Sequence, residues 1–94
     1  MTRIQPIDHQ TATGKAKTLL DAVKAKLGLV PNLTRVMANA PSVLEGYLGL
    51  SGALGGGALP AKVREQLALV VGQQNSCDYC LAAHTAIGLS LIHI

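Results

Sequence analysis

Hydrophobic residues recur with helical spacing in several stretches of the chain, and glycine or proline separates these stretches. In the first, from about Thr11 or Thr13 to Leu27, the apolar residues share one face and lysines occupy the others. Gly28 follows, where the C-terminus of a helix favours a residue in the left-handed conformation. The pattern therefore predicts a first helix that ends at Leu27. Its apolar face consists of Leu19, Leu20, Val23 and Leu27.

Prolines mark the boundaries of the next helices. A short helix is predicted to end before Pro41, because the residue before a proline avoids the helical conformation. Pro41 suits the first turn of the following helix, in which Tyr47 and the leucines around it are expected in the core. Gly52 and the glycines at 55–57 interrupt the pattern, so a loop is expected there. Pro60 precedes a further helix over about 61–73.

Composition agrees with an all-α fold. The hydrophobic residues are mainly Ala, Leu and Val, with two Tyr and no Phe or Trp. Ala and Leu are strong helix formers, whereas β-branched and aromatic residues favour strands. A chain of 94 residues without large aromatic side chains builds only a small core, so we expect oligomerisation to contribute to its stability.

Charge and hydropathy exclude several functions. The net charge of +3 is not gathered into a basic block, and no aromatic residues alternate with the basic ones, so binding to nucleic acid is not expected. The start of the chain lacks the apolar segment of a signal peptide, and no apolar stretch is long enough to span a membrane. We therefore expect a cytoplasmic protein, in which two cysteines are more typical of catalysis or metal binding than of a structural disulfide.

The candidate chemistry is concentrated in a C-x-x-C-x3-H pattern formed by Cys77, Cys80 and His84. Asn75 and Ser76 break the preceding helix and provide a side-chain cap for a final helix that begins at Cys77. At about 100° per residue, both thiols and the imidazole fall on one face. A helix N-terminus stabilises a thiolate, a second cysteine can trap an oxidised partner as a disulfide, and an imidazole can transfer the proton.

Glu65 is the fourth candidate residue. It lies on a helix that is apolar nearly all round, on the side opposite Val63 and Leu67. We expect neighbours to cover both sides of this helix, which would leave the carboxylate partly desolvated and suited to a proton relay. The alternative is an exposed glutamate at the start of a helix, beside Arg64. Periodicity alone leaves both readings open.

Pairs of cysteines at this spacing also serve in haem attachment, in thioredoxin-type sites and in zinc sites. Haem attachment requires a histidine directly after the second cysteine, where this chain has Leu81, and no strand precedes the motif as in thioredoxin. A closed zinc site requires four ligands. The chain offers Cys77, Cys80, His84 and either Glu65 or His9, although His9 lies in the extended start and is otherwise expected to face solvent. The residues favour redox chemistry, with a zinc site or inert helix positions as the open alternatives.

The pattern E-x11-C-x-x-C-x3-H resembles the AhpD-like alkylhydroperoxidases of the carboxymuconolactone decarboxylase superfamily. CDYCLAAHTAIG at 77–88 looks like the core helix of that family. GKAK at 14–17, LVPN at 29–32 and LEGY at 44–47 look like its peroxidase-related members. The resemblance covers essentially residues 1–88. The last six residues, 89–94, look like a translated sequencing adapter, and we expect them to be a non-native tail.

The resemblance implies an all-helical AhpD-like domain, incomplete because the family continues with further helices, with the C-x-x-C at the N-terminus of the last helix. It implies that Cys80 attacks a hydroperoxide and becomes a sulfenic acid, that Cys77 resolves it as a disulfide, and that Glu65 and His84 relay the proton. No metal or cofactor is implied. The implied partners are a dithiol reductant, such as a lipoylated protein, and further copies of the chain in a homo-oligomer.

Tyr79 departs from the best-studied relatives, which carry a further relay histidine immediately before the second cysteine. The departure bears on the rate and on the reductant. The decarboxylases of the superfamily lack the cysteine pair, so lactone decarboxylation is not expected. The alternative to a peroxidase is a zinc-binding or redox-sensing helical module that uses Cys77, Cys80 and His84.

Overall fold

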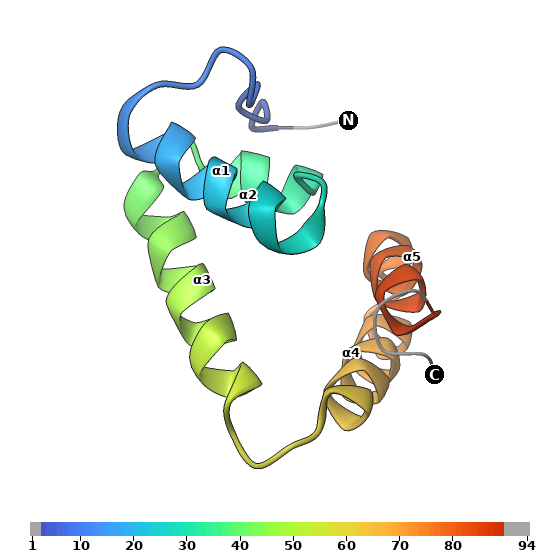
Figure 1. Ribbon diagram of the computed structural model, residues 1–94. Helices are drawn as coiled ribbons and strands as arrows, with labels where there is room; N and C mark the ends of the chain where they lie inside the picture. Colours follow the sequence, from blue (N-terminus) through green and yellow to red (C-terminus); the bar gives the residue numbers. More distant parts are fainter. Residues whose placement is uncertain (1–2, 90–94) are drawn as a thin grey trace. The chain divides into compact units, whose positions relative to one another are not determined.

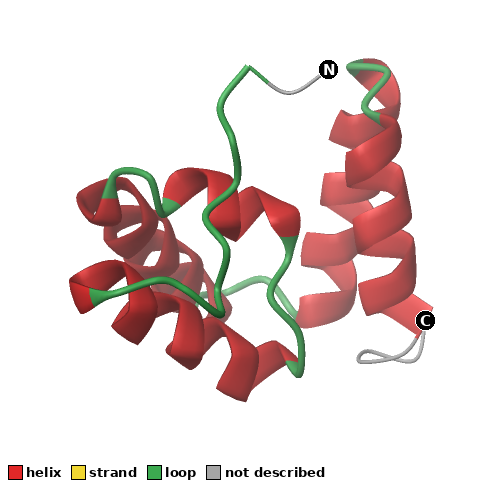
Figure 2. Cartoon of the chain, turned by 90° about the horizontal axis from the view of Figure 1, so that it is seen from above, coloured by secondary structure: helices red, strands yellow, loops and turns green. Residues whose placement is uncertain are grey.

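A computed structural model describes residues 3–89, and its regular structure in that range is entirely helical (Figures 1 and 2). The elements are α1 Gly14–Leu27, α2 Asn32–Met37, α3 Pro41–Gly55, α4 Ala61–Gln74 and α5 Asp78–Ile87. The predicted all-α fold is confirmed, with Cys77 and Cys80 at the start of the last helix. Apart from Leu89, the predicted tail lies outside the described residues. Within the described part, no helix is long and apolar enough to cross a bilayer.

The chain divides into two compact units, and the division falls between Ser51 and Gly52, inside α3. The first unit contains α1, α2 and most of α3. The second contains the end of α3 together with α4 and α5.

The core of the first unit forms where three helices meet. Leu20 of α1 and Leu44 of α3 are completely buried, and Ala38, just after α2, is nearly so. The predicted apolar face of α1 is thereby confirmed at its centre. Gly28 ends α1 as expected, with a φ of +82° and its N–H donating to the carbonyl of Lys24 at 2.7 Å.

The extended N-terminal segment is tied to this unit by hydrogen bonds. The N–H of Ile7 donates to the carbonyl of Arg35 at 3.0 Å, and Nε of Arg35 donates to the carbonyl of Ile7 at 2.8 Å. His9, which the sequence placed in solvent, is only 19% exposed and lies 2.6 Å from a carboxylate oxygen of Asp21. The expectation was wrong because a partner twelve residues away on α1 is invisible to local patterning.

Helix α3 differs from its prediction in length and in burial. It continues through Gly52 to Gly55, because a single glycine weakens a helix without ending it. Tyr47, expected in the core, is 39% exposed. The buried position on this helix is Leu44.

The second unit is a helical hairpin in which α4 and α5 lie side by side (Figures 1 and 2). Within residues 52–89 the only buried positions are Gly72 and Gly88, so the hairpin encloses no large apolar side chain. The expectation that both sides of α4 would be covered is wrong for this unit. α5 covers one side, and the other carries the exposed residues Leu67, Val70 and Val71.

Candidate functional site

The turn between α4 and α5 fixes the position of the first cysteine. Ser76 adopts the left-handed conformation with a φ of +53°, and its N–H donates to the carbonyl of Gln73 at 3.1 Å. The N–H of Cys77 then donates to the carbonyl of Gly72 at 2.9 Å. This pair of bonds is the Schellman motif that closes many helices, with serine at the position where glycine is most common. Cys77 is therefore anchored to the last turn of α4.

Cys77 itself caps α5, which corrects the prediction that Asn75 or Ser76 would do so. The helix begins at Asp78, and Sγ of Cys77 accepts a hydrogen bond from the N–H of Cys80 at 3.1 Å. A capping residue requires an extended backbone, which Cys77 has, with φ −95° and ψ 94°. Ser76 is committed to the left-handed conformation that ends α4 and is not available for this role.

Cys77 and Cys80 are joined by a disulfide, with their Cα atoms 5.2 Å apart. The two residues bracket the first turn of α5, and both are partly buried. Cys80 also faces α4, where a Cβ atom added to Gly72 would lie 3.1 Å from the Cβ of Cys80. The disulfide is thus packed against the end of α4.

Glu65 and His84 form the second contact across the hairpin. Oε2 of Glu65 lies 2.5 Å from Nδ1 of His84, and the two side chains are 14% and 34% exposed, respectively. The sequence left open whether Glu65 is covered or lies in solvent beside Arg64. Glu65 is covered, and Arg64 donates instead to the carbonyl of Leu59. An ionised Glu65 accepts from a protonated Nδ1, which leaves Nε2 as the second proton-transfer position of the ring.

The two contacts lie on matching faces of the hairpin. Glu65 and Gly72 are two turns apart on α4, and Cys80 and His84 are one turn apart on α5, so each pair shares one face of its helix. His84 contacts Glu65 in the first half of α4, and Cys80 faces Gly72 near the end of the same helix. The four residues singled out by the sequence therefore all belong to one helical hairpin.

Gly72 is the part of this site that sequence reasoning missed. It is buried, its carbonyl binds the amide of Cys77, and its bare Cα faces Cys80. The signal available in the sequence was a glycine inside an otherwise apolar helix, five residues before the first cysteine. Such a glycine often marks a close approach between helices.

The described residues do not form the ligand set that the zinc alternative requires. Among residues 3–89 no three His, Cys, Asp or Glu side chains are grouped so that they could hold a metal ion. The sulfurs of Cys77 and Cys80 are bonded to each other. His9, the other proposed ligand, belongs to the first unit and pairs with Asp21.

The hydrogen bond to His9 lowers the pKa of the Asp21 carboxyl, and the hydrogen bond and positive charge of Lys17 lower it further.

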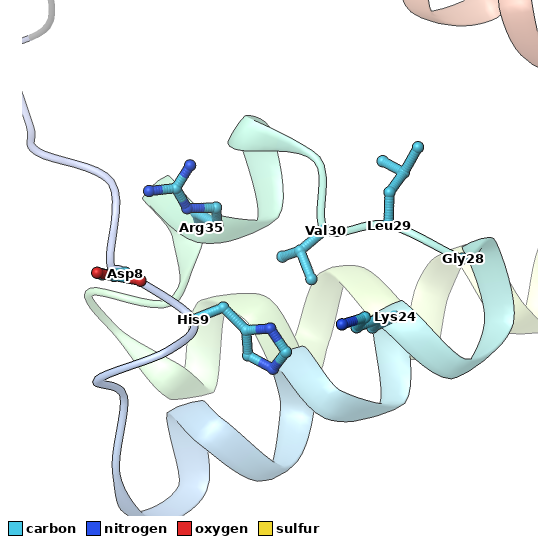
Figure 3. A pocket seen from close by; sticks show the side chains of 7 residues that line it. All are labelled: Asp8, His9, Lys24, Gly28, Leu29, Val30 and Arg35. Atoms are coloured by element: carbon cyan, nitrogen blue, oxygen red, sulfur yellow. The ribbon is translucent and has the colours of Figure 1, made fainter.

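A separate hollow of about 420 Å³ lies in the first unit, where α1 ends beside the N-terminal segment (Figure 3). It is lined by Asp8, His9, Lys24, Gly28, Leu29, Val30 and Arg35. None of the four candidate residues contributes to it, so the hollow does not belong to the dithiol site.

Comparison with known proteins identifies the family of the chain. No curated protein and no solved structure matched the chain. The model of the carboxymuconolactone decarboxylase family matches residues 41–91, just over half of the chain and the whole of the hairpin. The resemblance inferred from the C-x-x-C-x3-H pattern is thereby confirmed at the level of the family. The chain belongs to the carboxymuconolactone decarboxylase family.

Proposed function

We propose that this chain reduces hydroperoxides, including alkyl hydroperoxides, with Cys77 and Cys80 as its redox pair. The observation that carries the proposal is the combination of a disulfide at the start of α5 with a Glu65–His84 pair on the same hairpin. Thiol peroxidases need a second cysteine within reach of the first and a group that moves protons. Family membership supports redox chemistry of this kind without specifying the substrate.

The proposed reaction begins with the thiolate of Cys80. Its sulfur attacks one peroxide oxygen, the O–O bond breaks, and the alcohol leaves with a proton as Cys80 becomes a sulfenic acid. The thiol of Cys77 then loses its proton and attacks the sulfur of Cys80, forming the disulfide and releasing water. In sum, one peroxide and two thiols give one alcohol, one water and one disulfide.

Glu65 and His84 are the proposed proton relay. The Glu65 carboxylate holds Nδ1 of the imidazole at 2.5 Å and so orients the ring. Nε2 then accepts the thiol proton and returns it to the leaving alkoxide. His84 follows Cys80 by one turn on the same face of α5, which suits this transfer directly or through one water.

The catalytic cycle requires a reductant, and we assign this role to a dithiol, such as the lipoyl group of a lipoylated protein. A dithiol opens the Cys77–Cys80 disulfide by exchange and leaves as its own cyclic disulfide. We propose that the protein works in the cytoplasm, as a homo-oligomer and without a cofactor. The exposed apolar side of α4 supports oligomerisation, because single-chain proteins seldom leave such clusters uncovered.

Peroxide consumption by cysteine variants tests the proposal. The fully reduced chain is mixed with cumene hydroperoxide, first alone and then with excess dihydrolipoamide. The wild type should consume one equivalent alone and many equivalents with the dithiol. Cys77→Ser should consume one equivalent and retain a sulfenic acid that dimedone traps at Cys80, whereas Cys80→Ser should consume none.

Two results would contradict this assignment. Equal consumption by Cys80→Ser and the wild type would remove Cys80 from the reaction. Disulfide formation without turnover, whichever dithiol is supplied, would instead indicate a redox-sensing module.

A further inference from the structure

Gly72 differs from the other glycines inside the helices of this chain. A Cβ atom placed on it would lie 3.1 Å from Cβ of Cys80 and 3.7 Å from Cδ2 of Leu81. The same atom placed on Gly46 or Gly49 of α3 would meet nothing within 4 Å. A separation of 3.1 Å between two carbons is inside the normal contact distance of about 3.5–4.0 Å, so a side chain at position 72 displaces Cys80.

Gly72 also contacts the other cysteine. Its carbonyl accepts the N–H of Cys77 at 2.9 Å, as part of the turn that ends α4. One residue thus touches both members of the redox pair, Cys77 through its carbonyl and Cys80 through its bare Cα. Gly72 has no side chain that could react, so these contacts can act only on the positions of the two cysteines.

We propose that Gly72 is a positioning residue that stabilises the Cys77–Cys80 disulfide relative to the dithiol. In the oxidised form the disulfide ties Cys80 to Cys77, and Cys77 is held by the carbonyl of Gly72. Cys80 therefore cannot move away from α4 without distorting the closed turn. In the dithiol this tie is absent and α5 shifts more freely. A methyl group at position 72 thus raises the free energy of the oxidised form more than that of the reduced form.

This inference rests on the proposed role of Cys77 and Cys80 as the redox pair, and an equilibrium measurement tests it. The full chain is equilibrated with glutathione buffers, in which two glutathione thiols and the protein disulfide give glutathione disulfide and the protein dithiol. Acid quenching, alkylation and intact mass then give the fraction of each form. Gly72→Ala should shift the equilibrium about tenfold towards the dithiol, which corresponds to about 30 mV in reduction potential.

Gly46→Ala and Gly49→Ala are the matched controls. Each makes the same chemical change inside a helix, at a position with open space around it. Both should leave the equilibrium constant within about twofold of the wild type, because the added methyl group displaces no neighbour. The tenfold shift expected for Gly72→Ala corresponds to about 1.4 kcal/mol. A Gly72→Ala variant that also stays within that range would overturn the inference.

A measurement on the wild type covers the case in which Gly72→Ala does not fold. In the oxidised chain, NMR should show a strong cross-peak between the Hα protons of Gly72 and the Hβ protons of Cys80, and slow exchange of the Cys77 amide. Their absence would overturn the inference. The glutathione assay contains no peroxide. If Gly72→Ala shifts the equilibrium but the wild type does not reduce peroxide, only the peroxidase proposal is refuted. An active chain with no shift refutes the role of Gly72 alone.

Discussion

Neutralising Glu65 tests whether its bond to His84 holds the hairpin together. The change is Glu65→Gln, which keeps the size of the side chain and one accepting oxygen but removes the charge. A hydrogen bond to a charged group contributes about 1.5–3 kcal/mol. Glu65 is 14% exposed, but the ring of His84 is 34% exposed, so solvent screens part of the interaction. We expect a loss of about 1 kcal/mol in the free energy of unfolding of the second unit.

The assay must report on the second unit alone. The chain has two tyrosines and no tryptophan, and Tyr79 is the one in the hairpin. In a Tyr47→Phe background, tyrosine fluorescence during urea unfolding therefore follows this unit. Glu45→Gln is the matched control, because Glu45 pairs with Lys15 at 3.0 Å with both side chains more than half exposed. Since Glu45 lies in the first unit, its effect is followed by the fluorescence of Tyr47 in a Tyr79→Phe background.

The control and the variant should differ clearly. Many exposed ion pairs contribute nothing measurable to stability, so Glu45→Gln should change the free energy of unfolding by less than about 0.5 kcal/mol. If Glu65→Gln has as small an effect as Glu45→Gln, the Glu65–His84 bond does not stabilise the hairpin, and the reasoning from its burial is refuted.

Three further predictions concern single residues. His84→Gln should slow peroxide-driven disulfide formation by about 100-fold while the helix content by circular dichroism stays the same; an unchanged rate would remove His84 from the relay. Ser76→Gly should raise the free energy of unfolding by about 0.5–1 kcal/mol, since relief of about 1–2 kcal/mol of left-handed strain exceeds the cost of added freedom in the unfolded chain; urea unfolding that shows a loss would contradict this. The lowered pKa of Asp21 adds stability that is present above the ordinary titration range of aspartate and is lost as the pH falls through the folded pKa. His9→Gln should move this pKa, followed by carboxyl ¹³C NMR, back up towards its ordinary value, and no upward shift would refute the assigned cause.

Much of the site follows from the spacing of residues in the sequence. Helical periodicity placed Cys77, Cys80 and His84 on one face, and the hairpin turns Cys80 and His84 of that face towards α4. For Glu65, periodicity could not decide between burial and exposure, because it shows which residues share a face but not what covers that face. The partner of Glu65, His84, lies nineteen residues further along the chain.

The features that were missed depend on backbone conformation and on packing. That Cys77, rather than Ser76, caps α5 follows from the left-handed conformation of Ser76, which residue preferences do not predict for serine. The exposed side of α4, with Val70 61% exposed, was expected to be covered because the sequence does not say how many helices surround it. The role of Gly72 appears only when α4 and α5 are seen in contact.

The most direct test of the central claim is a count of free thiols before and after peroxide. The reduced, metal-free chain is treated with one equivalent of cumene hydroperoxide, and its thiols and intact mass are measured together. We predict that both cysteine thiols disappear and that the mass falls by two hydrogens, as formation of the Cys77–Cys80 disulfide requires. Unchanged thiols and an unchanged mass would contradict the proposal that this pair reduces peroxides.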